Sequence, residues 1–562
     1  MKKPKRFGRM VEQLKYLSDT LEEKIHHELR EKRENIMKKT KKMLVLLMVV
    51  IMACSLFMTG CGGKDNETDG DSSTLVIAIQ EEIEGTDIQQ IGWENVVHTL
   101  TYTPLVTFSE DLSEVLPCFA ESYETSDDGL TITFKLPADA KFSNGDPLDA
   151  EAVKKSFERF LTISEYSEDL GAVESIEAVD ETTLVFHLSQ AAPYMWANLT
   201  STYGGIVDVA SAEEVGDEEF NRAAVSNGMY YVEDWQAGSQ VVLAKNPYFQ
   251  TSNPNVQNKG VGSFDKIIVR FIPDEFTRVS ELESGNVDII WDVPTGSVED
   301  IEANEDLQTF YYKQAGVSYA MFNPDTGALK DINVRKAINI GIDREKIAKV
   351  LNNVVTPEYG FISEAQAGYS PEYAAKLAKE YAYNPDEAKA LLKEAGYADT
   401  DGDGFLDKDG KKLTIEYCAA TDSATSKSTA PVIQEQLKEL GIDLQITEYE
   451  GAYIKQLQRE NKFEMVSRRY VWNDADILYY VFTEESGYPW HDPEVTAALE
   501  KARYTTDSEE RVKAYEKFHD EIFKEMPAVS LFADNYCIAA TKEVKGFKVT
   551  NDGRPLFNDV TK

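Results

Sequence analysis

Thr74-Leu75-Val76-Ile77-Ala78-Ile79-Gln80 is a nearly continuous apolar stretch in a chain of 562 residues. A run of this kind is typical of a strand that is buried on both faces of a sheet. Two further strands, half-buried, are predicted over 130–136 and 184–188, where apolar and polar residues alternate. The stretch at 74–80 therefore predicts a strand in the interior of a sheet.

Helices and further strands alternate along the rest of the chain. Strands are predicted over 267–272, 287–291 and 442–447. Helices are predicted after Asp149, Asp331, Asp343 and Asn384, the last one ending at Gly396, and over 431–440. Helices that alternate with strands in this way indicate a mixed α/β chain of several lobes.

The composition limits the possible partners. The chain carries a formal net charge of −40, from 58 basic and 98 acidic residues. So acidic a surface repels nucleic acids and anionic lipids, which argues against both as partners. At 42% hydrophobic and 10% aromatic residues, the chain can bury large cores in two or three domains.

A secretory signal is predicted over 37–60. Its basic cluster at 37–42 precedes an apolar run at 43–58, and two small residues at 59–60 stand just before Cys61. The run holds about 16 residues, fewer than the roughly 20 that span a bilayer as a helix. The small residues before the cysteine resemble a lipobox, which implies cleavage there and attachment of lipid to Cys61. The other interpretation of the run is an uncleaved membrane anchor.

The segments on either side of the signal have different characters. Residues 1–36 are charged and helix-prone, and secretory signals seldom carry so long a leader. We hypothesise that translation starts at Met37 and that the leader reflects a misassigned upstream start. Residues 61–73 are polar and rich in glycine, which predicts a flexible tether. The rest of the chain is expected on the extracytoplasmic face of the cell membrane, attached to it.

The sequence lacks the common catalytic and metal-binding signatures. It holds no GxSxG, HExxH or Walker-type GxxxxGK segment, and its histidines are not paired at metal-ligand spacing. Cys118, Cys418 and Cys537 show no CxxC spacing, so buried thiols are expected, with a single disulfide as the alternative. We therefore expect that the chain is not an enzyme and needs no cofactor.

Several phrases recur in order over the part of the chain that follows Cys61. They include Leu116-Pro117-Cys118-Phe119-Ala120-Glu121-Ser122-Tyr123, Ala140-Lys141-Phe142-Ser143-Asn144-Gly145-Asp146-Pro147-Leu148, Asn227-Gly228-Met229-Tyr230, Lys245-Asn246-Pro247-Tyr248, Glu283-Ser284-Gly285-Asn286-Val287-Asp288 and Val334-Arg335-Lys336-Ala337-Ile338-Asn339. Together they resemble the family 5 extracellular solute-binding proteins of ABC importers, which capture oligopeptides, dipeptides or nickel complexes. The combination is specific to the family and much less specific to any one ligand.

The resemblance implies a type II periplasmic-binding-protein-like clamp, an α/β fold of two lobes with an extra domain inserted in the first. Lobe I would take 74–110, 226–322 and 531–562, the extra domain 111–225, and lobe II 323–530. The chain crossings near Asn323 and Leu531 would then be hinges. Closing the lobes would bury the ligand between them.

The resemblance also places ligand contacts in one segment, Arg469-Tyr470-Val471-Trp472-Asn473-Asp474-Ala475-Asp476. It implies that an aspartate after the tryptophan pairs with the α-ammonium of a peptide, and that Arg469 meets a carboxylate. Asp474 and Asp476 both remain candidates for the ammonium partner. Further ligand contacts are expected from Tyr470, Trp472 and Tyr230, and a solvated turn after a strand is the alternative for the whole segment. Trp93, Tyr102 and Tyr203 are further aromatic candidates for the pocket wall.

An acidic loop has the spacing of a calcium site. Asp399, Asp401, Asp403 and Asp407 occupy loop positions 1, 3, 5 and 9, with glycine at position 6. Position 12 is Gly410, where such a loop needs a bidentate glutamate. A weak Ca²⁺ site is one interpretation, and an acidic surface turn is the other.

We therefore predict a lipid-anchored, monomeric solute-binding protein that captures oligopeptides or dipeptides and delivers them to the permease and ATPase subunits of an ABC importer. A nickel–chelator complex or an oligosaccharide is an alternative ligand. A secreted hydrolase is an alternative of another class, and it would need a catalytic constellation that the sequence does not show. A signalling receptor without transport is a further alternative.

Overall fold

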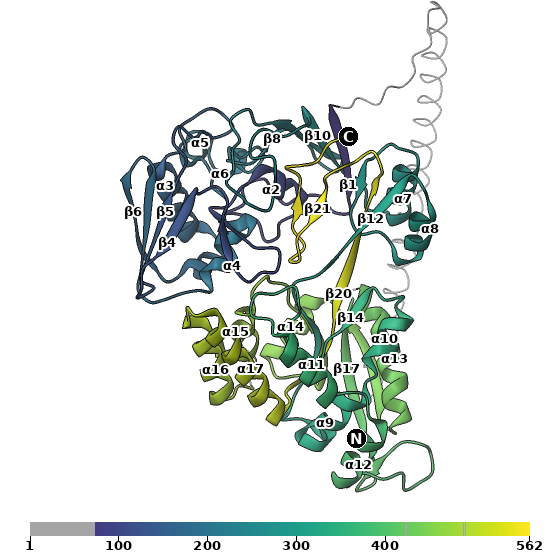
Figure 1. The fold of residues 1–562 in the computed structure, drawn as a ribbon. Coiled ribbons are helices and arrows are strands. Elements are labelled where there is room, and N and C mark those ends of the chain that lie inside the picture. Colours follow the sequence, from purple (N-terminus) through teal and green to yellow (C-terminus); the bar gives the residue numbers. More distant parts are fainter. Residues whose placement is uncertain (1–72, 422–423, 487, 489) are drawn as a thin grey trace, which may run out of the picture. The chain divides into compact units, whose positions relative to one another are not determined.

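The computed structural model describes residues 73–562, except 422–423, 487 and 489 (Figure 1). The predicted leader 1–36 and signal 37–60 lie outside the described residues, and so does Cys61. In the part of the chain that is described, no helix is both long and apolar enough to cross a membrane.

The opening apolar stretch forms β1 (Thr74–Ile79), in the interior of a 12-stranded mixed sheet, as predicted. β1 pairs in parallel with β10 (Lys266–Phe271) on one side and with β11 (Ile289–Ile290) on the other. β11 is shorter than the strand predicted over 287–291. The other strands of this sheet are β8 (Tyr230–Gln236), β9 (Gln240–Lys245), β12 (Leu307–Lys313), β13 (Ser318–Phe322), β14 (Val355–Pro357), β17 (Thr414–Ala420), β18 (Asp443–Tyr449), β19 (Met465–Arg469) and β20 (Ala528–Thr541).

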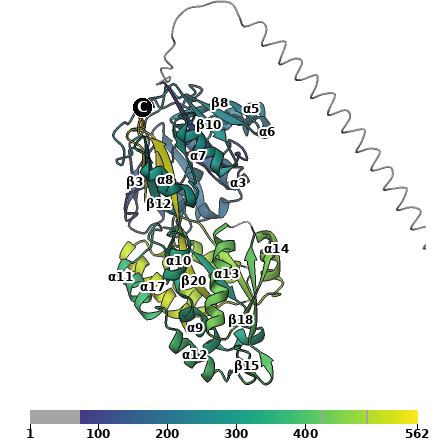
Figure 2. The ribbon, with the colours of Figure 1, turned by 90° about the vertical axis from the view of Figure 1, so that its right-hand side faces the viewer.

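The long strand β20 connects the two halves of this sheet (Figure 2). Its first residues pair with β13, and residues 535–541 pair with β12 in the half that contains β1. The change of partner comes a few residues after Leu531, where the sequence placed a hinge. The second crossing is the link from β12 to β13, which ends before Asn323. We propose that the half with β1 is lobe I and that the half with β13 is lobe II.

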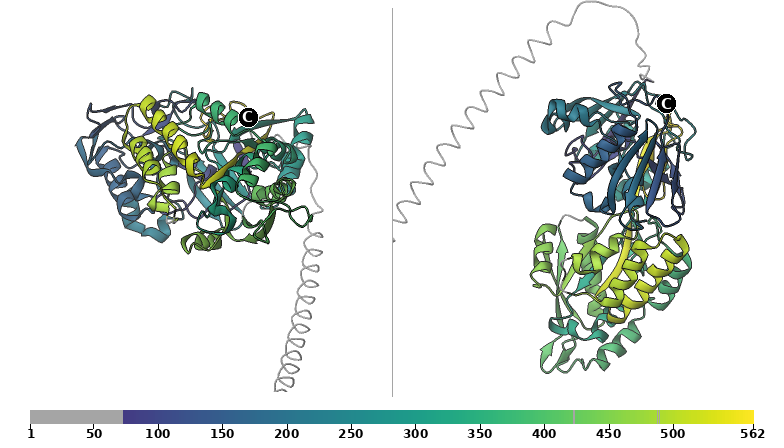
Figure 3. Two further views of the ribbon diagram at one scale, coloured as in Figure 1. Left: turned by 90° about the horizontal axis from the view of Figure 1, so that it is seen from below. Right: turned by 90° about the vertical axis from the view of Figure 1, so that its left-hand side faces the viewer.

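A separate four-stranded antiparallel sheet forms the core of the predicted extra domain (Figure 3). Its strands are β4 (Ser122–Thr125), β5 (Thr131–Lys135), β6 (Val173–Asp180) and β7 (Thr183–Leu188). Helix α3 (Ala150–Ile163) packs on it, and Phe157 of α3 contacts Phe186 of β7 edge to face, with ring centroids 5.2 Å apart. These aromatic contacts give the domain a hydrophobic core of its own.

The predicted helix starts are confirmed by their caps. The side chains of Asp149, Asp331, Asp343 and Asn384 each accept a hydrogen bond from a backbone N–H of the first turn that follows. The helices of lobe II are α9 (Ile332–Gly341), α10 (Arg344–Val350), α11 (Pro371–Glu380), α12 (Pro385–Glu394), α13 (Ala424–Glu439), α14 (Gly451–Arg459), α15 (Ile477–Phe482), α16 (Pro493–Tyr504) and α17 (Ser508–Glu525). The other α-helices among the described residues are α2 (Val96–Thr101), α4 (Met195–Thr200), α5 (Val209–Val215), α6 (Asp217–Phe220), α7 (Glu275–Glu283) and α8 (Val298–Ala303).

One helix start was wrong. The prediction began a helix at Pro431, but α13 begins at Ala424 and holds Pro431 in its interior. Ala430 and Ile433, on either side of this proline, are buried in the core of lobe II. This packing outweighs the local preference of proline.

Gly228, in the motif Asn227-Gly228-Met229-Tyr230, holds the end of α2 against the start of β8. Its N–H donates to the carbonyl of Thr101 at 2.9 Å. A Cβ at this position would lie 2.0 Å from the carbonyl carbon of Thr101, so no side chain fits. The Asn227 side chain donates to the carbonyl of Thr103 at 2.7 Å and completes the junction.

Cys118, Cys418 and Cys537 are free and buried, in agreement with the buried-thiol interpretation. Burial raises the pKa of Cys118 and Cys537 to about 11 and that of Cys418 to about 12. The three thiols are therefore protonated at neutral pH and are poor nucleophiles.

Candidate functional site

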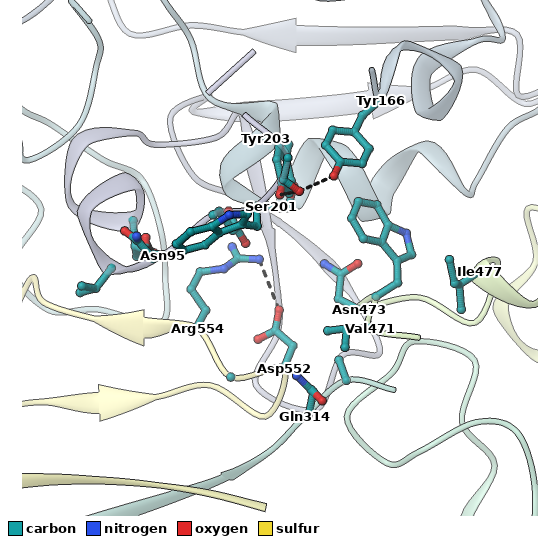
Figure 4. Close-up of a pocket in the computed structure, with 18 of the residues that line it drawn as sticks. Asn95, Tyr166, Ser201, Tyr203, Gln314, Val471, Asn473, Ile477, Asp552 and Arg554 are labelled. Carbon is teal, nitrogen blue, oxygen red and sulfur yellow. Dashed lines mark hydrogen bonds and ion pairs between the residues drawn. The ribbon is translucent and has the colours of Figure 1, made fainter. Parts of the chain in front are cut away.

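A cavity of about 1000 Å³ is lined by residues from lobe I, the extra domain and lobe II (Figure 4). Lobe I contributes residues around the start of α2 and the loop between β21 (Lys548–Val549) and β22 (Pro555–Leu556). The extra domain contributes residues near the short 3₁₀ helices Ser167–Leu170 and Thr202–Gly204, and lobe II contributes the loop between β19 and α15. Both chain crossings also reach the wall, through Gln314 and Tyr536 among others.

Two of the predicted ligand contacts, Trp472 and Asp476, line this cavity. The backbone N–H of Trp472 donates to the carbonyl of Ala315 at 2.7 Å. Its ring lies near that of Tyr203, with centroids 6.4 Å apart, so the two aromatics approach each other from lobe II and the extra domain. Asp476 is 5% exposed and forms an ion pair with Arg503 of α16.

The other predicted contacts lie outside the cavity wall. Asp474 is 1% exposed and is engaged by Arg511 of α17 through two hydrogen bonds of 2.7 and 2.8 Å. Arg469 faces Asp534 of β20, 3.7 Å away. Tyr470 donates its hydroxyl hydrogen to the carbonyl of Phe361, within lobe II.

Tyr230 and Tyr102 are likewise buried in the protein interior and do not line the cavity. The hydroxyl oxygen of Tyr230 accepts a hydrogen bond from the backbone N–H of Phe264 at 3.2 Å, inside the core of lobe I. Tyr102 donates to the carbonyl of Thr86 at 2.7 Å. Trp93 and Tyr203, the other aromatic candidates, do line the cavity.

Three buried polar atoms at the cavity have no hydrogen-bond partner among the described residues. They are Nδ2 of Asn95, Oδ1 of Asn473 and Oδ1 of Asp476. Asn95 and Asn473 come from opposite lobes (Figure 4). Buried polar atoms are rarely left unpaired. These three expose almost no surface to the cavity, so a ligand would reach them only after the side chains or the lobes move.

The sequence reasoning missed the contribution of the C-terminal hairpin loop. Asp552 and Arg554, which form an ion pair with a distance of 3.3 Å, reach the cavity from this loop (Figure 4). Asp552-Gly553 is a typical turn dipeptide, and Gly553 has a φ of 86°. This signal could have indicated the turn, but nothing local indicates that the turn faces a cavity.

Acidic residues far outnumber basic ones in the cavity wall. Of the described residues that line it, eight are acidic and one, Arg554, is basic. The acidic ones are Glu81, Glu94, Glu165, Glu168, Asp169, Asp292, Asp476 and Asp552. Burial raises the pKa of Asp169 to about 6, and it also raises the pKa of Asp292.

The geometry of the acidic loop after α12 fits both a weak Ca²⁺ site and an acidic surface turn. Carboxylate oxygens of Asp399, Asp401 and Asp403 lie within 4.8 Å of one another, all on exposed side chains. Asp407, the fourth predicted ligand, instead accepts hydrogen bonds from the N–H and hydroxyl of Thr400. Asp403 also pairs with Lys412 at 2.7 Å. Calcium binding stays a prediction.

A cavity between two lobes is typical of a protein that encloses a solute. Comparison with known families gives the same result. The sequence model of the bacterial extracellular solute-binding proteins, family 5 (middle), matches residues 114–490, which is more than half of the chain. The chain belongs to this family. The resemblance drawn from the sequence phrases is therefore confirmed.

Named relatives of this family 5 protein bind different solutes. The probable D,D-dipeptide-binding periplasmic protein DdpA of Escherichia coli is 26% identical over 483 residues, 82% of this chain and 87% of DdpA. The oligopeptide-binding protein AppA of Bacillus subtilis is 25% identical over 557 residues, 92% of this chain and 98% of AppA. The structure of NikA from Brucella suis in complex with Fe(III)-EDTA matches with a TM-score of 0.76 at 24% identity, over 87% of this chain and 99% of NikA. The likeness to such structures confirms the type II clamp with its extra domain.

Proposed function

We propose that this family 5 protein captures short peptides in the cavity and delivers them to an ABC permease, while a lipid on Cys61 holds it at the cell membrane. The observation that carries the peptide assignment is that carboxyl groups, amide side chains and aromatic rings line one cavity. Asp476 offers a carboxylate oxygen, Asn473 an amide oxygen and Asn95 an amide N–H. A peptide carries the complementary groups, namely an ammonium, backbone N–H groups and backbone carbonyls.

The size of the cavity agrees with this ligand. Its volume of about 1000 Å³ lies at the upper end of the roughly 300–1000 Å³ that is usual for small-molecule pockets. Aromatic rings from both sides, such as Trp472 and Tyr203, supply the apolar surface that a peptide of varied side chains needs. The alternative ligands fit a buried carboxylate less well. An anionic chelate would be repelled by its charge, and a neutral oligosaccharide would leave the charge without a counter-ion.

Contacts across the cavity support a clamp whose closed form a permease could recognise. The guanidinium of Arg503 lies 3.8 Å from the ring centroid of Tyr194, which connects lobe II with the extra domain. Asn473 also reaches the extra domain, where its amide donates to the carbonyl of Ala197 at 3.4 Å. These contacts form only when the two sides meet, so a bound peptide would stabilise them together.

Native mass spectrometry of the full chain, purified in mild detergent from cells grown in rich medium, tests the ligand. We expect co-purifying masses that form a ladder of short peptides, because the carboxylate and the amides contact groups common to all peptides. A single mass with a metal isotope pattern, or a hexose series, would replace the peptide by another solute. Peptide hydrolysis during incubation with the purified protein would contradict a binding function and favour a hydrolase.

The lipid anchor has its own test. We expect Cys61→Ser to remove incorporation of labelled fatty acid and to shift the protein from the membrane fraction to the medium of a Gram-positive host, because serine lacks the thiol that accepts the lipid. Cys118→Ser is the matched control, since this buried thiol lies within the folded domains. Retention of Cys61→Ser in the membrane would instead support the uncleaved anchor.

A further inference from the structure

The cavity is far more acidic than the chain as a whole. Over the whole sequence 98 acidic residues face 58 basic ones, whereas eight acidic residues face a single arginine among the described residues of the cavity wall. The excess is local to the place where a solute is enclosed.

Most of these carboxyl groups form no direct ion pair within the described part of the chain. Asp476 pairs with Arg503 and Asp552 pairs with Arg554. The other six form no ion pair within the described part of the chain, and they are Glu81, Glu94, Glu165, Glu168, Asp169 and Asp292. Arginines at a longer distance still favour the charged form of three of the six, namely Arg554 for Glu94, Arg503 for Asp169 and Arg278 for Asp292. Among the described residues of the cavity wall, Glu81, Glu165 and Glu168 have neither an ion pair nor such an arginine.

The six carboxyl groups occupy two sides of the cavity. Glu165, Glu168 and Asp169 lie on the extra domain, near Asp476 of lobe II, whose charge interacts with that of Asp169. Glu81, Glu94 and Asp292 lie on lobe I, where Glu81 and Asp292 repel each other. A solute with separated positive charges could therefore meet carboxylates at both sides.

Four of the six carboxyl groups are exposed in this structure, namely Glu81, Glu94, Glu165 and Glu168. If the lobes close over a ligand, these groups lose hydration and then need a positive partner. Aromatic rings in the same wall favour the same charge. Trp93, Tyr203 and Trp472 line the cavity, and the faces of such rings attract ammonium and guanidinium groups. The field of the excess carboxylates would also draw cations into the cavity before contact.

We propose that the cavity selects solutes with several positive charges, and specifically peptides rich in lysine or arginine. This inference rests on the proposed peptide-binding function and adds to it the charge of the preferred side chains. A single ammonium at the end of the peptide would satisfy only one of the carboxylates, so the excess on the two sides points to basic side chains.

Calorimetric titration of the full chain in detergent with trilysine, trialanine, triglutamate and spermidine tests the proposal. We expect trilysine to bind at least about tenfold more tightly than trialanine, and triglutamate to bind most weakly. The advantage of trilysine should shrink as salt concentration rises, because part of the attraction acts through solvent.

Two variants localise the effect. Glu94→Gln and Asp292→Asn each remove one charge at nearly constant shape, and asparagine suits the positive φ of 53° at position 292. We expect each to weaken trilysine binding several-fold and to leave trialanine binding unchanged. Glu218→Gln, on exposed α6 away from the cavity, is the matched control and should change neither.

The outcomes separate this inference from the proposed function. Equal affinity for trilysine and trialanine, or a preference for triglutamate, would overturn the charge selectivity while peptide binding stands. Binding of spermidine without any of the peptides would overturn peptide binding while the preference for cations stands. Binding of none of the four would overturn both.

Discussion

We expect Asp474→Ala to lower the free energy of unfolding by about 3–5 kcal/mol, because it leaves a buried guanidinium without its counter-ion. Both oxygens of Asp474 accept hydrogen bonds from Arg511, and the Asp474 side chain is 1% exposed. After the substitution, the hydrogen-bond partners left to Arg511 in the described part of the chain are the hydroxyl of Tyr515 and the carbonyl of Ala502. Chemical denaturation followed by tryptophan fluorescence measures the loss.

A surface ion pair provides the control for this experiment. Asp403 and Lys412 lie at the same distance of 2.7 Å, but their side chains are 38% and 40% exposed. Asp403→Ala should leave the unfolding midpoint nearly unchanged, because water solvates the remaining lysine. If the two variants lost equal stability, the buried pair would not stabilise lobe II in the way its geometry indicates.

The second large effect is on binding. Burial raises the pKa of Asp476 to about 7, so the carboxyl group is mostly charged only above that pH. At pH 8 we expect Asp476→Asn to weaken the binding of a tripeptide with a free N-terminus by about 30-fold or more, because it removes the charge that faces the peptide ammonium. Asparagine preserves the shape of the side chain and leaves an oxygen for Arg503, so the fold should persist. Calorimetric titration of both proteins with the same tripeptide gives the ratio of affinities.

The N-acetylated form of the same tripeptide makes this test specific. It lacks the ammonium, so we expect it to bind weakly to the unchanged protein and equally weakly to Asp476→Asn. If the substitution weakened both peptides by the same factor, Asp476 would act through its ion pair with Arg503 on the shape of the cavity, and the ammonium would bind elsewhere.

The two aspartates show how far the sequence could specify the site. The sequence placed Asp474 and Asp476 in one segment and left open which of them meets a ligand. In the structure, Asp474 faces α17 and its arginine, whereas Asp476 reaches the cavity wall. The choice depends on the position of Arg511, a residue 37 positions further along the chain, and no pattern around Asp474 reports it.

Strands, helix caps and the family could be recognised from the sequence alone. Asp149 and Asn384 cap their helices as predicted, because a cap involves only residues of the next turn. The opening stretch forms β1 because its apolar side chains must leave water on both faces of a sheet. Where long-range packing competes with a local preference, as at Pro431 inside α13, the local signal was wrong.

Only the tertiary structure decided which side chains meet at the cavity. Glu94, Tyr203, Trp472 and Arg554 come from four distant parts of the sequence. They become neighbours because β20 and the link from β12 to β13 carry the chain twice between the two halves of the sheet. Helix and strand signals depend on neighbours along the chain, whereas the charge of a cavity depends on which loops the packed cores bring together. The sequence therefore determined the family and the elements, and the fold determined the acidic cavity.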